Sequence, residues 1–149
     1  MWKVANYQIS LKCFLKNNKW ETLILKTTPS SSFLWTYDFP GWRIDEDEFE
    51  VDYIDILKRE IFEETWIKSV LIENKVVAIA RHKVLAHLRK HSDEDNYIFY
   101  IFYEWFLDCE DCVISNEHAD FKWVKLEEII LEDYFMSWYL EWVKMYLGK

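Results

Sequence analysis

The sequence predicts one α/β domain over residues 1–149, with strands on both sides of a central amphipathic helix. Three observations lead to this prediction. Residues 8–15 alternate polar and apolar side chains, residues 53–65 repeat apolar side chains at helical spacing, and residues 97–107 form a long apolar strand. A chain of this length is sufficient for one domain with a hydrophobic core and short for two.

The first predicted strand, residues 8–15, has a period of two. One face carries four apolar residues and the other is more polar: Ile9, Leu11, Cys13 and Leu15 against Ser10, Lys12 and Phe14. Residues 17–19, Asn-Asn-Lys, are turn formers, so residues 20–26 are predicted as the hairpin partner. Residues 27–32, TTPSSS, are predicted to form a loop.

The central helix is predicted over residues 53–65. Its apolar positions Ile54, Leu57 and Ile61 recur at three- and four-residue spacing, which places them on one face. The acidic segment before it, residues 44–52, is predicted to be an exposed loop that leads into the helix.

The second half of the chain adds strands and then helices. Strand character is predicted for residues 69–80, 81–88, 97–107 and 121–126, with a turn at 91–96. Residues 126–134 are predicted to be helical, and residues 135–147 form a second helix with five aromatic residues on one face: Phe135, Trp138, Tyr139, Trp142 and Tyr146. We interpret this stripe as core packing, and a homodimer contact is the alternative.

Composition excludes several classes of function. The formal charge of −9 argues against binding of long nucleic acid, which needs clustered Lys and Arg against phosphates. The longest apolar run, residues 97–103, is far shorter than the roughly 20 residues of a membrane helix, so no membrane interaction is expected. The amino terminus does not resemble a signal peptide, and the odd number of cysteines, three, indicates reduced thiols. We therefore expect a soluble protein of the cytoplasm.

Four charged residues on the central helix indicate a chemistry. Glu60 shares a helix face with Glu63 and Glu64, and Arg59 is one turn before Glu63. Converging carboxylates repel unless a cation lies between them, and oxygen ligands suit Mg²⁺ or Mn²⁺. Such an ion binds phosphate oxygens and activates water for attack at phosphorus. The alternative is an ordinary solvated acidic face.

The flanks of these residues resemble the signature of the Nudix hydrolases. That signature reads Gly, five residues, Glu, seven residues, Arg-Glu-U-x-Glu-Glu-x-Gly-U, where U is a bulky aliphatic residue. Residues 59–65, REIFEET, match it in order, and Ile67 fills the last position. Upstream, YDFPGW at 37–42 is similar to the W-x-x-P-G-G approach of the family. Downstream, EHADFKWVKLEEI at 117–129 resembles its closing segment.

The chain departs from this signature in three places. Ten residues instead of seven separate Glu48, counted as the first motif glutamate, from Arg59, so Glu46 and Glu50 are alternatives to Glu48. The two motif glycines are Trp42 and Trp66. A glycine after the helix permits a left-handed cap that a bulky residue disfavours by about 1 kcal/mol or more. We therefore predict a different helix exit at Trp66, with its ring over the last turn.

The resemblance implies an α/β/α sandwich around a mixed β-sheet and hydrolysis of a nucleoside diphosphate linked to another group, with Mg²⁺ or Mn²⁺. Carried over by position, Glu60, Glu63, Glu64 and Glu48 would be metal ligands. Arg59 would tether the glutamates, and the resemblance implies that Arg59 and Glu64 also belong to the catalytic group. Glu117 is the candidate general base, and an ordinary surface glutamate is the alternative for it.

Substrate binding is expected outside the motif. The aromatic residues Trp35, Tyr37 and Trp42 are candidates for stacking on a base, with Phe33 beside them, and Arg43 is a further candidate contact. Arg81 begins the basic stretch 81–91, which either contacts phosphates or is an exposed hairpin. The substrate is then a nucleoside triphosphate or a nucleotide conjugate. The alternative function is a catalytically weak or inactive Nudix-like module that binds a nucleotide or a protein.

Overall fold

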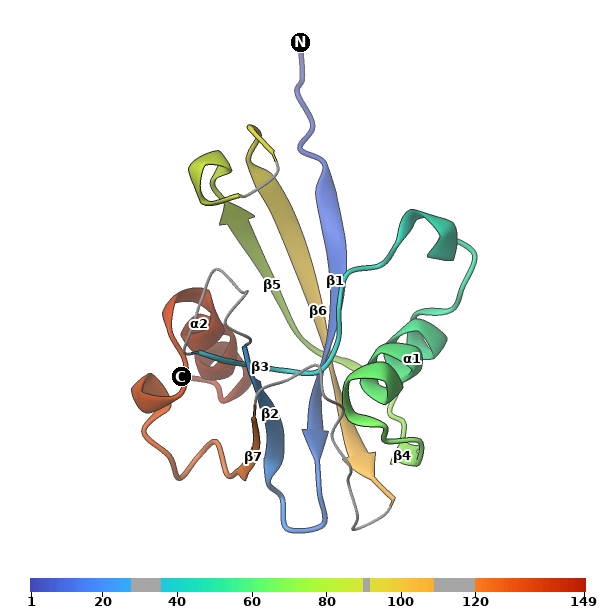
Figure 1. Ribbon diagram of the computed structural model, residues 1–149, viewed down its shortest axis with the longest axis vertical. Coiled ribbons are helices and arrows are strands. Elements are labelled where there is room, and N and C mark those ends of the chain that lie inside the picture. Colours follow the sequence, from blue (N-terminus) through green and yellow to red (C-terminus); the bar gives the residue numbers. More distant parts are fainter. Residues whose placement is uncertain (28–35, 90–91, 109–119) are drawn as a thin grey trace.

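A mixed β-sheet between two helices forms the framework of the computed structural model, which describes residues 1–27, 36–89, 92–108 and 120–149 (Figure 1). The predicted α/β/α sandwich is confirmed. The strands are β1 (Tyr7–Lys16), β2 (Thr22–Lys26), β3 (Tyr37–Asp38), β4 (Val70–Leu71), β5 (Val76–Val84), β6 (Asn96–Leu107) and β7 (Phe121–Val124). The helices are α1 (Tyr53–Thr65) and α2 (Ser137–Tyr146), with short 3₁₀ turns η1 (Glu46–Glu48), η2 (Ala86–Leu88) and η3 (Leu131–Asp133).

Strand β1 lies at the centre of the sheet. It runs parallel to β6 over its whole length and forms the predicted antiparallel hairpin with β2. Beyond these, β2 pairs with β3 and β7, while β6 pairs with β4 and β5, all antiparallel. The described strands thus form one seven-stranded sheet whose only parallel pair is β1 with β6.

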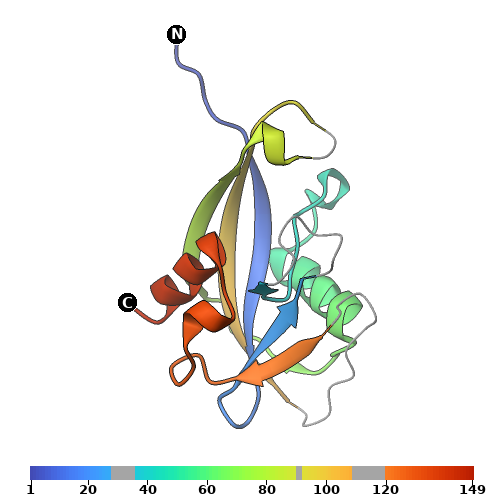
Figure 2. The same ribbon diagram turned by 60° about the vertical axis from the view of Figure 1, so that its left-hand side comes forward.

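The period of two in β1 decides which helix covers which face of the sheet. Leu11, Cys13 and Leu15 are fully buried in a cluster with the apolar side chains of α1, and Phe14 is buried in the cluster that contains those of α2. Figure 2 shows α1 and α2 on opposite sides of the sheet. Burial of each large apolar side chain stabilises the fold by roughly 1.5–3 kcal/mol, so both helices are held by this alternation.

Helix α1 begins and ends at the predicted residues. The carboxylate of Asp52 accepts a hydrogen bond from the Ile54 N–H at 2.9 Å, which caps the first turn. The prediction of a changed exit is wrong: Trp66 takes the left-handed cap at φ 59° and ψ 14°, and its side chain is 60% exposed. The neighbours Thr65 and Ile67 are both buried, and this anchoring outweighs the cost of the left-handed conformation.

Three predictions in the second half need correction. The strand character predicted at 69–80 is divided between β4 and β5, and residues 72–75 lie outside both strands. Residues 126–134 form turns and η3 in place of a regular helix, because the backbone there serves the sheet: the Tyr37 N–H donates to the Tyr134 carbonyl at 2.9 Å. Strand character at 81–88 ends with β5 at Val84, and η2 follows.

The aromatic stripe of α2 is core packing, as predicted. Tyr139 and Trp142 are buried together with Phe135, and the Trp138 ring stacks on His82 with 3.7 Å between centroids. The aromatic face that was considered as an alternative dimer contact therefore packs against the core of this chain. Neither helix, nor any other in the described ranges, has the length and apolar character needed to cross a bilayer.

Candidate metal and substrate site

The guanidinium of Arg59 stands at the centre of a carboxylate cluster. Its Nη1 donates to both oxygens of Glu63 at 3.1 and 3.0 Å, one helical turn away. Its Nη2 forms an ion pair with Glu60 Oε1 at 2.9 Å and pairs with the carboxylate of Glu48. The three carboxylates repel one another, and Arg59 holds them together as the sequence analysis expected of a tether.

Of the three glutamates considered for the first motif position, Glu48 is the one that contacts the helix. It lies in η1, and its second oxygen accepts a hydrogen bond from the Asp45 N–H at 2.9 Å. Glu46 and Glu50 are exposed. The longer loop before α1 is thus accommodated by a 3₁₀ turn that aims Glu48 at Arg59.

Glu64 lies apart from Arg59, on the side of α1 that faces the sheet. Its Oε2 accepts a hydrogen bond from the Gly41 N–H at 2.9 Å. Burial raises the pKa of the Glu64 carboxyl to about 8, and nearby Lys12 and the Gly41 hydrogen bond oppose that rise. Burial also raises the pKa of Glu60, against the effect of Arg59. A positive charge nearby stabilises the ionised form of each of these two carboxyl groups.

Position 41 requires a glycine. Its φ is 122°, and a Cβ there would lie 2.1 Å from the Leu11 carbonyl oxygen. The next residue, Trp42, has no left-handed backbone and is half exposed, so a side chain replaces the motif glycine at 42 without strain.

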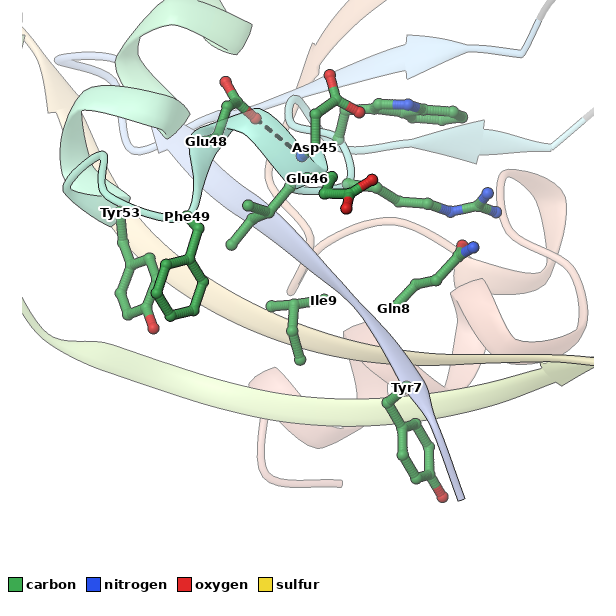
Figure 3. Close-up of a pocket in the computed structure, with 11 residues that line it drawn as sticks. Tyr7, Gln8, Ile9, Asp45, Glu46, Glu48, Phe49 and Tyr53 are labelled. Carbon is green, nitrogen blue, oxygen red and sulfur yellow. Dashed lines mark hydrogen bonds between the residues drawn. The ribbon is translucent and has the colours of Figure 1, made fainter. Parts of the chain in front are cut away.

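A pocket of about 580 Å³ opens beside Glu48 (Figure 3). Trp42 and Arg43, both predicted to bind substrate, contribute to it, and the Arg43 guanidinium carbon is 5.4 Å from the centroid of the Trp42 ring. The remaining lining is partly aromatic and partly acidic: Tyr7, Gln8, Ile9, Ile44, Asp45, Glu46, Glu48, Phe49 and Tyr53. Figure 3 draws Phe49, Tyr53 and Ile9 among the residues that line the pocket.

The other predicted site residues lie elsewhere. Tyr37 is buried, its hydroxyl 3.3 Å from Asp120, and does not line this pocket. Arg81 is exposed on β5, opposite Phe99 of β6. Trp35 and Glu117, together with Phe33, fall outside the described residues.

Lys12 is a site residue that the sequence pattern did not indicate. The pattern assigns it to the more polar face of a strand, yet Lys12 is 3% exposed and its ammonium forms an ion pair with Asp38 at 2.8 Å. The signal for it is a lysine flanked by apolar residues at the centre of the most buried strand.

The donor set fits a hard divalent cation by its chemistry, because all four candidate ligands supply carboxylate oxygens. In the described part of the chain, however, no three His, Cys, Asp or Glu side chains are grouped closely enough to hold an ion. Arg59 engages Glu48, Glu60 and Glu63, and Gly41 engages Glu64. Metal binding would therefore have to compete with these contacts.

Comparison with known proteins assigns the class. The family model of the NUDIX domain matches residues 6–146, so the chain belongs to this family. Membership supports activity of the pyrophosphohydrolase kind. No curated protein sequence matches the chain significantly.

Solved structures share the fold. A MutT protein from Methanosarcina mazei Go1 is 23% identical, with 95% of this chain and 94% of that one covered and a TM-score of 0.73. The NUDIX domain of Shewanella oneidensis NrtR, complexed with ADP ribose, is 13% identical, with 97% and 89% covered and a TM-score of 0.66. The E. coli dihydroneopterin triphosphate pyrophosphohydrolase is 14% identical, with 96% and 99% covered and a TM-score of 0.63. At these sequence identities, the comparison shows a shared fold and nothing more specific.

Proposed function

We propose that the protein is a metal-dependent hydrolase that cleaves the diphosphate linkage of a nucleoside triphosphate or nucleotide conjugate in the cytoplasm. The observation that carries this proposal is the gathering of Glu48, Glu60 and Glu63 around Arg59 in a NUDIX chain, with Glu64 on the same helix and bound to Gly41. Three carboxylates near the end of α1 and a fourth in η1 suit a divalent cation as their partner, because the substrate's phosphates are also negative.

The residues divide into ligands and supports. Glu60, Glu63 and Glu64 would hold Mg²⁺ or Mn²⁺, with Glu48 as a further ligand. When bound, the cation would neutralise phosphate oxygens and lower the pKa of an attacking water. Arg59 keeps the carboxylates together before binding. Glu117 is the proposed general base, on the strength of the sequence resemblance alone.

The pocket beside Glu48 is proposed to take the end of the substrate that carries no phosphate. Its rim includes the carboxylates of Asp45, Glu46 and Glu48, which repel free phosphate. Its aromatic residues offer flat surfaces for a base. We propose that Arg43, on the same lining, contacts the phosphate that the ribose joins to that base.

The test is release of phosphate and pyrophosphate from a panel of nucleoside triphosphates, dinucleotides, ADP-ribose and sugar nucleotides, with Mg²⁺ or Mn²⁺ present. Glu64→Gln is the inactivating variant, and Glu50→Gln is its matched control because Glu50 is an exposed glutamate. We expect turnover in the wild type and the control and loss of at least about 100-fold in Glu64→Gln. Equal turnover in all three would contradict the proposed site.

A binding module without turnover is the second candidate. One observation favours it: the described carboxylates are already engaged by Arg59 and Gly41 and are not grouped around an ion position. A folded protein that binds a nucleotide of the panel, shows no turnover and gains no thermal stability in millimolar Mg²⁺ or Mn²⁺ would establish this candidate.

A further inference from the structure

We infer that Lys12 is a positioning residue for Glu64, acting through the backbone of residues 38–41. The inference rests on the proposed function where it treats Glu64 as a metal ligand. The contacts that carry it run from a buried ammonium to a turn and from that turn to the carboxylate.

All three protons of the Lys12 ammonium have an acceptor. They are donated to Asp38 Oδ2 at 2.8 Å, to the Phe39 carbonyl at 3.2 Å and to the Gly41 carbonyl at 2.9 Å. Because the side chain is buried, water cannot take over these bonds. Lys12 therefore fixes the turn more firmly than a surface lysine would.

The two carbonyls that Lys12 binds belong to the peptide groups on either side of the one that reaches Glu64. That central peptide, between Pro40 and Gly41, accepts at its oxygen from the Cys13 N–H at 2.9 Å and donates its N–H to Glu64 at 2.9 Å. Its direction is thus set by Lys12 on both flanks and by β1 behind it. Loss of the ammonium would leave two buried carbonyls to find new partners, and the central N–H would turn with them.

Electrostatics act in the same sense. Lys12 and the Gly41 hydrogen bond both lower the pKa of Glu64, whereas burial and the charge of Asp38 raise it. Lys12 thus bears on Glu64 by its charge as well as through the turn.

Lys16 is a matched control on the same strand and the same face. It is also buried, its ammonium is 3.7 Å from Glu104, and it lies over the Tyr146 ring at 5.4 Å. Its contacts with Glu104 and Tyr146 involve neither the 38–41 turn nor Glu64. Lys16→Met therefore removes a buried lysine and leaves the proposed relay intact.

The experiment uses glycine-selective ¹⁵N labelling of the full chain. The sequence has two glycines, Gly41 and Gly148, so two backbone resonances are expected, and Glu64→Gln identifies Gly41. Without metal, we expect Lys12→Met and Lys12→Met/Asp38→Asn to move the Gly41 amide proton in the direction that Glu64→Gln does. Lys16→Met should leave it in place. The double variant removes both members of the Lys12–Asp38 ion pair, so that the Asp38 carboxylate is not left without its partner. It therefore serves as the test if Lys12→Met does not fold.

Metal affinity supplies the second readout. Mn²⁺ should broaden the Gly41 resonance of the wild type and spare Gly148, and the Lys12 variants should need about tenfold more Mn²⁺ for the same effect. A Gly41 resonance unmoved by loss of Lys12, or moved equally in Lys16→Met, overturns the inference. A wild type indifferent to Mn²⁺ counts against the proposed function instead, and the metal-free shifts still decide the role of Lys12.

Discussion

The backbone N–H of Gly41 donates to the carboxylate of Glu64 at 2.9 Å, across 23 positions of the sequence. This bond joins the proline-glycine turn beside β1 to the side of α1 that faces the sheet. Gly41 can approach so closely because it has no Cβ to meet the Leu11 carbonyl. The glycine retained by this chain is therefore the one with a structural role, whereas the position occupied by Trp42 makes no such demand.

The first prediction concerns the pH dependence of stability without metal. The pKa of Glu64 is raised from 4.5 to about 8 in the folded protein, so the folded state binds this proton more tightly than the unfolded state. The contribution of Glu64 to the free energy of unfolding is therefore greatest below about pH 4.5. It is lost as the pH rises through 8, a total decrease of about 5 kcal/mol. Urea unfolding in EDTA from pH 5 to 9 measures the slope.

Glu64→Gln is the control for that slope, because it keeps the shape of the side chain and removes its titration. The variant should lose less stability than the wild type over the same range. Mn²⁺ binding should strengthen in the wild type as the pH rises to 8, since the ligand must first lose its proton. Parallel unfolding curves for the two proteins would contradict the assignment.

The second prediction separates Glu48 from its neighbours. Glu48→Gln weakens the contact with the half-buried Arg59 and should lower the free energy of unfolding by about 1 kcal/mol. Glu46→Gln and Glu50→Gln remove exposed charges and should stay within about 0.5 kcal/mol of the wild type. Urea unfolding at pH 7 measures all three. An equal loss in Glu50→Gln would show that the loop is held in another way.

The third prediction concerns the two tryptophans at the motif glycines. Trp66→Gly relieves a left-handed backbone at a mostly exposed side chain and should stabilise the protein by about 1 kcal/mol. Trp42→Gly relieves no strain, adds chain entropy to the unfolded state and should destabilise by roughly 0.5–1 kcal/mol. Thermal unfolding of both variants beside the wild type shows whether each substitution raises or lowers stability. A loss of stability in Trp66→Gly would mean that the Trp66 ring makes stabilising contacts.

Local patterns were sufficient to predict the framework of this fold. Alternation in residues 8–15 identified β1 and sorted its side chains between the two helices, because a strand's period does not depend on its neighbours. The period of residues 53–65 gave both ends of α1. The motif spacing predicted the shared helix face of Glu60 and Glu64 for the same reason.

The errors arise where tertiary contacts override local preference. Propensity argued against a left-handed Trp66, but buried neighbours fix the backbone there. Residues 126–134 have helical spacing, yet β3 uses the Tyr134 carbonyl. Lys12 was assigned to a polar strand face, and only the fold shows that the turn at 38–41 covers it. These contacts join segments that no local pattern relates.

The last prediction distinguishes the two arginines proposed to bind substrate. Arg43 lines the pocket beside Glu48, next to the ring of Trp42. Arg81 of β5 pairs with Phe99 of β6, and Phe99 pairs with Ile9 of β1, which lines the pocket. Arg81 therefore lies two strand spacings, about 10 Å, from the β1 side of the pocket. Loss of a charged hydrogen bond to phosphate weakens binding by about 1.5–3 kcal/mol. Arg43→Met should therefore raise KM at least about tenfold with kcat little changed.

Arg81→Met is the matched control for that experiment, because it removes the same charge from an exposed position outside the pocket lining. Its KM should stay within about twofold of the wild type, since a single exposed charge at this distance is largely screened at physiological ionic strength. Steady-state kinetics on the best substrate of the panel measure both variants at one salt concentration. A larger KM effect in Arg81→Met would place the phosphates over β5 and β6, on the far side of β1 from Arg43.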